Sequence, residues 1–192
     1  MILTEPRWKS YIITSNEPVF SPEQCEDIIR VGKSLPQEDA ATGHTGTGKK
    51  NYKVRKTDIV WIPFNRMPEM YRTLEYWGTK VNSNHFGFDG IQLREMAQFS
   101  QYSKNHHYGW HTDSSFHMEK EPPVRKISMV TMLNNPKDFK GGELQLVDER
   151  QTLTLKQGHA VFFASFIVHR VLPVKKGTRL SMPVWFTGPP LK

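Results

Sequence analysis

The chain has 192 residues, a net charge of +7, 37% hydrophobic residues and a single cysteine, Cys25. This hydrophobic content excludes a disordered chain, and the lone cysteine excludes an internal disulfide framework. No stretch is long and apolar enough to cross a bilayer, and Glu5, Arg7 and Lys9 exclude a secretory signal core. We therefore expect a single domain over residues 1–192, located in the cytoplasm and without a membrane partner.

Helix signals dominate the N-terminal part of the chain. Ser21, Pro22 and Gln24 predict a helix start, because serine caps, proline suits the first turn and Gln24 completes a capping box. A second helix is predicted from about residue 68 to residue 82, where apolar and aromatic side chains form one stripe. We assign this stripe to the core and expect no chemistry from it.

The segment GHTGTGKK, residues 43–50, approaches a phosphate-binding loop but departs from it. Lys50 replaces the Ser or Thr that would hold magnesium. The preceding residues are polar, and residues 54–62 after it predict a strand where such a loop needs a helix. We therefore interpret residues 43–50 as a basic surface loop.

Strand signals dominate from Gly90 onward. Short segments rich in Val, Ile, Thr and aromatic residues alternate with Gly, Pro and Asn, which is typical of sandwiches and barrels. We predict an α+β, mostly β fold with a double-stranded β-helix (jelly roll, cupin-like) core over 91–192. Residues 1–90 would supply supporting helices and a substrate loop. The predicted core strands are 93–100, 127–133, 143–147, 152–155, 160–164 and 180–187.

Four histidines and one aspartate crowd into HHYGWHTDSSFH, residues 106–117. In an extended strand, His111 and Asp113 project to the same face. One further neutral ligand would complete a 2-His-1-carboxylate triad, which leaves one face of an octahedral Fe(II) site open. His169 follows the apolar run AVFFASFIV and is the predicted third ligand.

Arg179 lies ten residues after His169, in RLSMPVWF. A buried arginine needs an anion, because an unpaired buried charge is costly, and a dicarboxylate held bidentately would supply one. Ser181 shares the strand face of Arg179 and could add a hydroxyl donor. An isolated His-x-Asp is frequent by chance, whereas this extended pattern is far more specific.

The chain from about Gln98 to Pro189 resembles the Fe(II)- and 2-oxoglutarate-dependent dioxygenases, within them the prolyl 4-hydroxylase-like branch. The segments that carry the resemblance are QFSQYSKNHHYGWHTD, RKISMVTMLN, FKGGELQL and KQGHAVFFASFIVHRVLPVKKGTRLSMPVWFTG. It implies that His111, Asp113 and His169 bind iron and are catalytic. Fe(II), 2-oxoglutarate and O2 are the implied cofactors, with ascorbate as a further candidate.

The resemblance also implies a cosubstrate pocket. Arg179 would hold the distal carboxylate of 2-oxoglutarate, and Tyr102 matches a pocket tyrosine. Oxygen-sensing members carry a tyrosine before the Leu-Asn of the first core strand, where this chain has Met132. The distal carboxylate would therefore depend on Arg179 and on a hydroxyl such as that of Ser181 or Thr131.

A substrate pocket is implied as well. Trp185 matches a pocket-lining tryptophan, and VRKTDIVWI is similar to the strand that precedes the active site, which would place Arg55 and Trp61 near a peptide groove. Tyr108 is either a pocket wall or a packing residue.

The implied reaction is hydroxylation of a prolyl residue in a protein or peptide. A free amino acid or other small molecule is the first alternative substrate. A methylated nucleic acid ranks lower, because the basic charge permits it but no base-reading motif accompanies the charge. A non-catalytic, cupin-like binding protein is the alternative from another class, and Arg179 argues against it, because a pure metal binder has no need of a dicarboxylate anchor.

Overall fold

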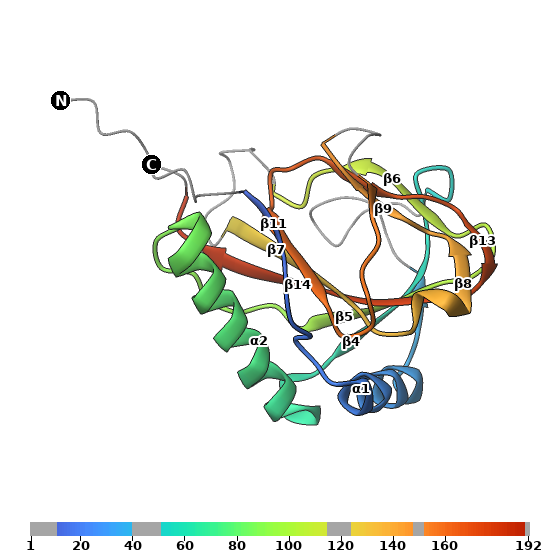
Figure 1. Ribbon diagram of the computed structural model, residues 1–192, viewed down its shortest axis with the longest axis horizontal. Coiled ribbons are helices and arrows are strands. Elements are labelled where there is room, and N and C mark those ends of the chain that lie inside the picture. The colour runs from blue at the N-terminus through green and yellow to red at the C-terminus, as the bar shows by residue number, and fades with distance from the viewer. Residues whose placement is uncertain (1–10, 40–50, 115–123, 148–151, 191–192) are drawn as a thin grey trace.

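The computed structural model describes residues 11–39, 51–114, 124–147 and 152–190. Two antiparallel sheets form its centre, and Figure 1 shows the helices below the larger sheet and the smaller sheet above it. This mostly β arrangement confirms the predicted fold class. The predicted substrate loop at 43–50 lies outside the described residues.

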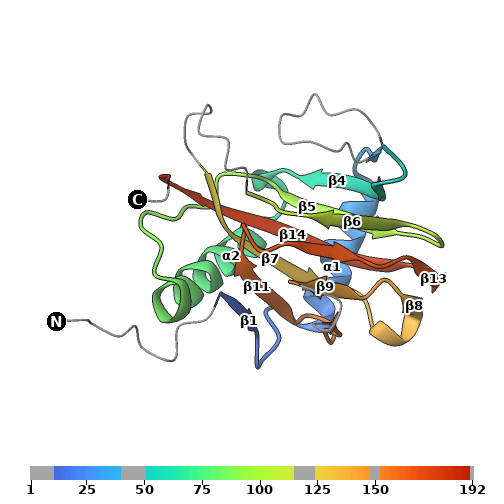
Figure 2. The same ribbon diagram turned by 90° about the horizontal axis from the view of Figure 1, so that it is seen from above.

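The larger sheet joins strands that are distant in sequence, and Figure 2 shows most of them in order across the molecule. The neighbours are paired antiparallel, as in a jelly roll. In spatial order they are β1 (Ile12–Thr14), β11 (Ala160–Ala164), β7 (Val124–Met132), β14 (Arg179–Gly188), β5 (Ala97–Tyr102), β4 (Asp58–Ile62) and β2 (Glu38–Asp39).

The smaller sheet faces the larger one, and a separate two-stranded sheet lies at one end of the molecule. It pairs β8 (Phe139–Gly141) with β13 (Val174–Gly177), which are distant in sequence. The smaller sheet has the order β10 (Thr152–Leu153), β9 (Leu144–Leu146), β12 (His169–Val171), β6 (His107–His111) and β3 (Arg55–Lys56).

The single strand predicted over 54–62 is wrong, because the chain changes sheet within it. Strand β3 pairs with β6 in the smaller sheet, and β4 pairs with β5 in the larger one. Thr57 lies between the two strands, and its hydroxyl donates to the Gln101 carbonyl at 3.1 Å. This N-terminal part supplies β1 to β4, so the strands of residues 1–90 belong to the same sheets as those of 91–192.

The two predicted helices are confirmed. Helix α1 (Pro22–Ser34) begins with the predicted capping box, in which Gln24 N donates to Ser21 Oγ and Ser21 N to Gln24 Oε1. Helix α2 (Pro68–Val81) continues as a π-helical turn, η2 (Asn82–Phe86), which ends at Gly87 in the left-handed region. Two short 3-10 turns, η1 (Phe64–Arg66) and η3 (Pro136–Asp138), complete the described helical structure.

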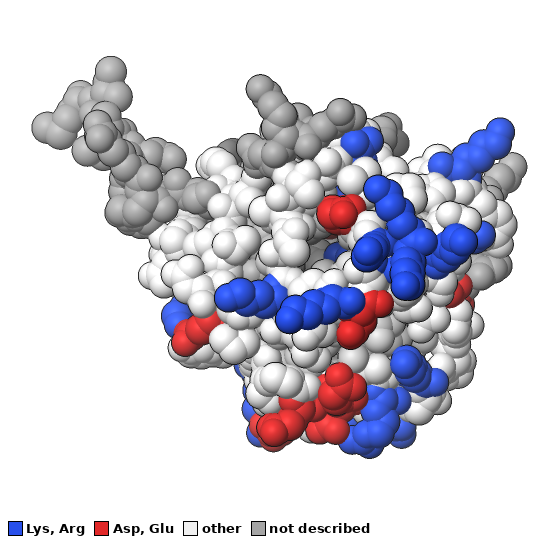
Figure 3. Space-filling view, turned by 45° about the vertical axis from the view of Figure 1, so that its right-hand side comes forward, with Lys and Arg blue, Asp and Glu red and all other residues white. Residues whose placement is uncertain are grey.

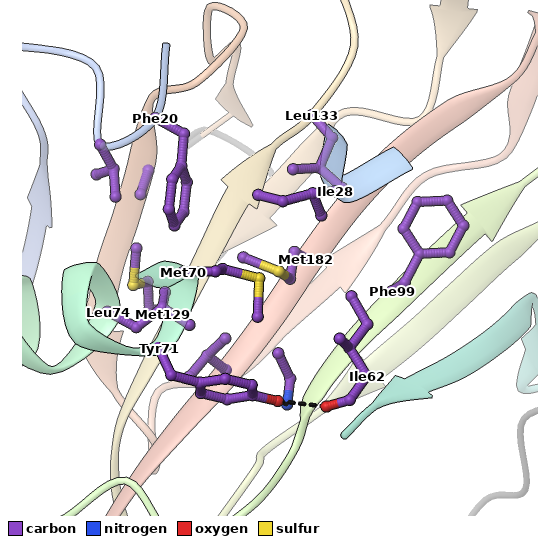
Figure 4. Packing of buried hydrophobic residues seen from close by; sticks show 14 of the residues in the cluster. Phe20, Ile28, Ile62, Met70, Tyr71, Leu74, Phe99, Met129, Leu133 and Met182 are labelled. Atoms are coloured by element: carbon purple, nitrogen blue, oxygen red, sulfur yellow. Dashed lines mark hydrogen bonds between the residues drawn. The ribbon is translucent and has the colours of Figure 1, made fainter. Parts of the chain in front are cut away.

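Strict alternation along β14 separates two cores. Leu180, Met182, Val184 and Phe186 face the helices, whereas the residues between them face the smaller sheet. Figure 4 shows the helix-side core, where the Tyr71 hydroxyl donates to the Ile62 carbonyl and accepts from Ala97 N. The inner core between the sheets contains Tyr102, Val130, Met132, Leu144, Leu146, Leu155, Val161, Phe163, Val171 and Val174.

No helix within the described ranges is long and apolar enough to span a membrane.

Candidate metal centre

His111, Asp113 and His169 converge between the sheets, with one ligand atom of each within 4.8 Å of the others. His111 and His169 are direct partners across β6 and β12, and their ring centroids are 4.1 Å apart. Asp113 Oδ1 lies 3.7 Å from His111 Nε2, and Asp113 Oδ2 lies 3.5 Å from His169 Nε2. These separations exceed hydrogen-bond lengths and suit side chains that share one cation.

The backbone turns both imidazoles toward the same point. His111 Nδ1 lies 2.8 Å from the Gly109 carbonyl oxygen, and His169 Nδ1 lies 3.0 Å from that of Ile167. A proton on each Nδ1 satisfies its carbonyl and leaves the Nε2 lone pair free to bind a metal.

Asp113 reaches the site by a different route from the predicted one. Strand β6 ends at His111, so Asp113 does not share a strand with that histidine. The backbone N–H groups of Asp113 and Ser114 instead donate to the Ser165 carbonyl, at 2.9 Å each. The turn between β11 and β12, which also leads to His169, therefore sets the position of the carboxylate.

Burial and neighbouring charges hold the three groups in the forms that bind metals. Burial lowers the pKa of His111, and His169 lowers it further, so the imidazole is neutral. Burial raises the pKa of Asp113, but His169, His111 and the Ser128 hydrogen bond outweigh it and leave the pKa below its ordinary value. The Trp185 indole N–H also faces this carboxylate, although its geometry falls short of a hydrogen bond.

Arg179 is a buried cation at the start of β14, on the inner face of the larger sheet, and it is only 1% exposed. Its Nη1 donates to Ser181 Oγ at 2.6 Å, and its guanidinium carbon lies 5.3 Å from the centroid of the Tyr102 ring. Its Nε has no hydrogen-bond partner, and no carboxylate of the described chain forms an ion pair with it. Such a guanidinium fits an anionic ligand, because burial without a counter-charge is costly.

Thr131 does not join this anion site, contrary to the prediction. It lies opposite Met182 and Ala160 in the larger sheet, and both of these belong to the helix-side core. Alternation along β7 therefore points its hydroxyl away from Arg179, and that hydroxyl has no partner.

Two tryptophans of the predicted substrate set, Trp61 and Trp185, lie on the inner face with ring centroids 6.1 Å apart. Arg125, which sequence reasoning missed, places its guanidinium carbon 3.8 Å from the centroid of the Trp185 ring. Arg125 is also held by Glu95, with Nε to Oε1 at 2.7 Å. Its position at the start of the apolar strand β7 was the available signal.

Arg55 and Tyr108, the other two residues of the predicted substrate set, lie in the smaller sheet next to His111. Tyr108 stacks on His111 with ring centroids 3.5 Å apart and planes 13° apart. The Arg55 guanidinium carbon lies 4.4 Å from the centroid of the Tyr108 ring, since the two residues are direct partners across β3 and β6. The structure therefore brings all four predicted substrate residues to the inner strands around the triad.

Exposed lysines gather on the two-stranded sheet formed by β8 and β13. Lys140 and Lys176 lie directly opposite each other, and Lys175 is their exposed neighbour. Figure 3, which brings this end of the molecule forward, shows Lys and Arg side chains collected there. Part of the net positive charge thus lies outside the strands that carry the triad.

A jelly roll that buries a His-Asp-His group beside an inner arginine defines the class of Fe(II) oxygenases that use a dicarboxylate cosubstrate. The chain belongs to the 2OG-Fe(II) oxygenase superfamily, whose family model matches residues 97–187. A PKHD-type hydroxylase of Crocosphaera subtropica is 34% identical over 180 residues, covering 91% of this chain and 77% of that protein. A PKHD-type hydroxylase of a Psychrobacter species is 38% identical over 92 residues, and that match spans 45% of this chain and 36% of the relative.

Solved structures show the same fold. The viral collagen prolyl hydroxylase of Paramecium bursaria Chlorella virus-1 superposes with a TM-score of 0.71 at 19% identity, covering 93% of this chain and 97% of that one. A prolyl hydroxylase of Trichoplax adhaerens, in complex with a peptide fragment of hypoxia inducible factor, superposes with a TM-score of 0.69 at 16% identity. The match covers 92% of this chain and 83% of that one. Membership of this superfamily implies Fe(II), 2-oxoglutarate and O2 as cofactors.

Proposed function

We propose that the protein hydroxylates a prolyl residue of a protein or peptide, with His111, Asp113 and His169 holding Fe(II). Arg179 carries this proposal, because its buried Nε has no partner and it lies on the inner face of the larger sheet, which faces the smaller sheet that carries His111 and His169. Together with Ser181 and Tyr102, Arg179 would hold the distal carboxylate of 2-oxoglutarate.

The chain and the iron would divide the work. Bound Fe(II) supplies the activation of oxygen for hydroxylation. The protein fixes its ligands through the Gly109 and Ile167 carbonyls, binds the cosubstrate at Arg179, and keeps water away from a site between two sheets.

The substrate proposal rests on the aromatic and cationic side chains around the triad. Trp61 and Trp185 offer aromatic surface that suits a pyrrolidine ring, and Tyr108, whose ring contacts His111 and Arg55, adds an aromatic wall. Arg55 and Arg125 add hydrogen-bond donors for peptide carbonyls. The structural relatives support a peptide substrate, because one is a collagen prolyl hydroxylase and another is a prolyl hydroxylase in complex with a peptide fragment. The same residues would also accept a free amino acid, the second candidate substrate. The use of ascorbate and a cytoplasmic location stay predictions.

Turnover with Fe(II) and 2-oxoglutarate tests the proposal. We expect succinate to form from 2-oxoglutarate whenever a substrate is oxidised. Mass spectrometry should show a gain of one oxygen atom in proline-containing peptides. Oxidation of free proline without oxidation of peptides would shift the assignment to a small molecule, and methyl loss from nucleic acid would shift it to repair. No succinate under any condition would favour a binding protein.

Two variants separate the two parts of the site. His111→Ala should abolish metal binding, because it removes one of three ligands. Arg179→Met should bind the metal as wild type does but weaken 2-oxoglutarate by roughly 100-fold, the loss typical of a charged hydrogen-bonded contact. Isothermal titration with Mn(II), then with 2-oxoglutarate, measures both steps. Wild-type behaviour in both variants would contradict the site assignment.

A further inference from the structure

Two buried hydroxyl groups support Asp113 at Oδ2, the oxygen that also lies 3.5 Å from His169 Nε2. Ser128 Oγ lies 2.7 Å from Asp113 Oδ2, and Ser165 Oγ lies 2.9 Å from Ser128 Oγ. Ser128 is 0% and Ser165 1% exposed, so no bulk water competes for these bonds. We call Ser165, Ser128 and Asp113 the serine relay.

Proton counting gives the serine relay a direction. An ionised carboxylate only accepts hydrogen bonds, so Ser128 donates to Asp113. Ser128 has a single hydroxyl proton, and it must therefore accept from Ser165. The hydrogen bonds thus run from Ser165 through Ser128 to Asp113 Oδ2.

The serine relay joins three separate segments. Ser128 lies in β7 of the larger sheet, Asp113 follows β6 of the smaller sheet, and Ser165 begins the turn from β11 to β12. The backbone of Ser165 adds to this link, because its N–H donates to the Lys126 carbonyl at 2.9 Å while its own carbonyl accepts from Asp113 N. The turn that leads to His169 and the segment that carries Asp113 are therefore both fixed to the buried strand β7.

We propose that Ser128, oriented by Ser165, is a positioning residue that makes Asp113 bind the metal through one oxygen. This inference rests on the proposed function, since it takes Asp113 as an Fe(II) ligand. The charge-assisted bond at Oδ2 lowers the electron density that this oxygen can offer a metal, and so favours Oδ1 as the ligand atom. A carboxylate that bound through both oxygens would take a fourth coordination position and compete with the cosubstrate.

Thr131 offers a matched control for Ser128. Both hydroxyls are fully buried in β7, but Thr131 points to the helix-side core and has no partner. Ser128→Ala and Thr131→Val each remove one buried hydroxyl from the same strand, and only the first changes a contact of Asp113.

The test uses Co(II) and anaerobic Fe(II) as probes, with 2-oxoglutarate added to the Fe(II) protein. We expect Ser128→Ala to weaken metal or 2-oxoglutarate binding by about 10-fold or more and to change the visible absorption spectrum. Thr131→Val should match wild type in both readouts, and Ser128→Thr, which keeps the donor, should restore them. Ser165→Ala should fall between Ser128→Ala and wild type, because it removes only the group that orients Ser128.

The outcomes separate this inference from the function on which it rests. A wild-type protein that binds neither Co(II) nor Fe(II) overturns the proposed function. A wild-type protein that binds both, with Ser128→Ala within about twofold of it and an unchanged spectrum, overturns the role of Ser128 alone. If Ser128→Ala does not fold, Ser165→Ala decides, and a spectrum and affinities equal to wild type overturn the relay.

Discussion

His111 shows how one side chain links the candidate site to stability. Burial, with a further contribution from His169, lowers its pKa below the ordinary value of 6.5, because the imidazolium would lose hydration and meet a second imidazole. As the pH falls below that value, the unfolded chain takes up a proton at this histidine and the folded chain does not. The free energy of unfolding of the metal-free protein therefore decreases toward acid pH.

We expect His111→Gln to remove this part of the pH dependence. Between about pH 7 and pH 5, wild type should lose roughly 1–2 kcal/mol more stability than the variant. Urea unfolding in the presence of a chelator measures the difference. His107→Gln is the control, since it lies on the same strand outside the triad, and it should follow wild type. Equal losses in wild type and His111→Gln would contradict the prediction.

At the scale of elements, the turn after β8 packs directly against the side chain of Arg179. Gly142 has a φ of +72°, and a Cβ there would lie 2.8 Å from Val174 Cγ2 and 3.0 Å from Arg179 Cδ. Glycine is therefore needed for its conformation and also for the close approach of the Arg179 stem. Gly142 belongs to FKGGELQL, one of the segments that carry the family resemblance. The close packing on Arg179 is a physical reason for glycine at this position.

We expect Gly142→Ala to destabilise the protein by about 2–4 kcal/mol, from left-handed strain together with crowding. It should also weaken 2-oxoglutarate while leaving Mn(II) affinity unchanged, because the displaced group is Arg179. Gly90→Ala is the control, since φ there is +57° but the nearest atom to the added Cβ is 3.5 Å away. It should lose only about 1 kcal/mol, the cost of the backbone conformation. Chemical denaturation and calorimetric titration give the two quantities, and equal effects of the two variants would contradict the packing argument.

At the scale of the whole molecule, the helices and the site lie on opposite faces of one sheet. Gly78 of α2 approaches Phe186 of β14 so closely that an added Cβ would lie 2.2 Å from the ring. The neighbouring residue Trp185 points to the opposite, inner face, beside the candidate metal centre. The contact that sets how closely α2 approaches the sheet therefore involves Phe186, the residue next to Trp185 of the site.

Gly78→Ala tests this contact, because two effects of opposite sign compete. Alanine favours a helix over glycine by about 1 kcal/mol, but crowding in a packed core costs about 1–3 kcal/mol. We expect a net loss of stability, and a smaller one when Phe186→Leu makes room, so that the double-mutant cycle is non-additive. A Gly78→Ala protein that is more stable than wild type in urea would show that the helix can move away from the sheet at little cost.

The sequence by itself determined the residue types of the site and the general architecture. Alternating apolar strands, the capping box at Ser21 and the spacing of His111, Asp113, His169 and Arg179 are local patterns, and local patterns can be recognised along one chain. The sequence did not determine which face of β7 each hydroxyl would take, so Thr131 was assigned to the anion site and Ser128 was missed. It also did not show the change of sheet at Thr57. Only the tertiary structure decided these points, because register and face depend on partners that are distant in sequence, such as Ser165 for Asp113 and Met182 for Thr131.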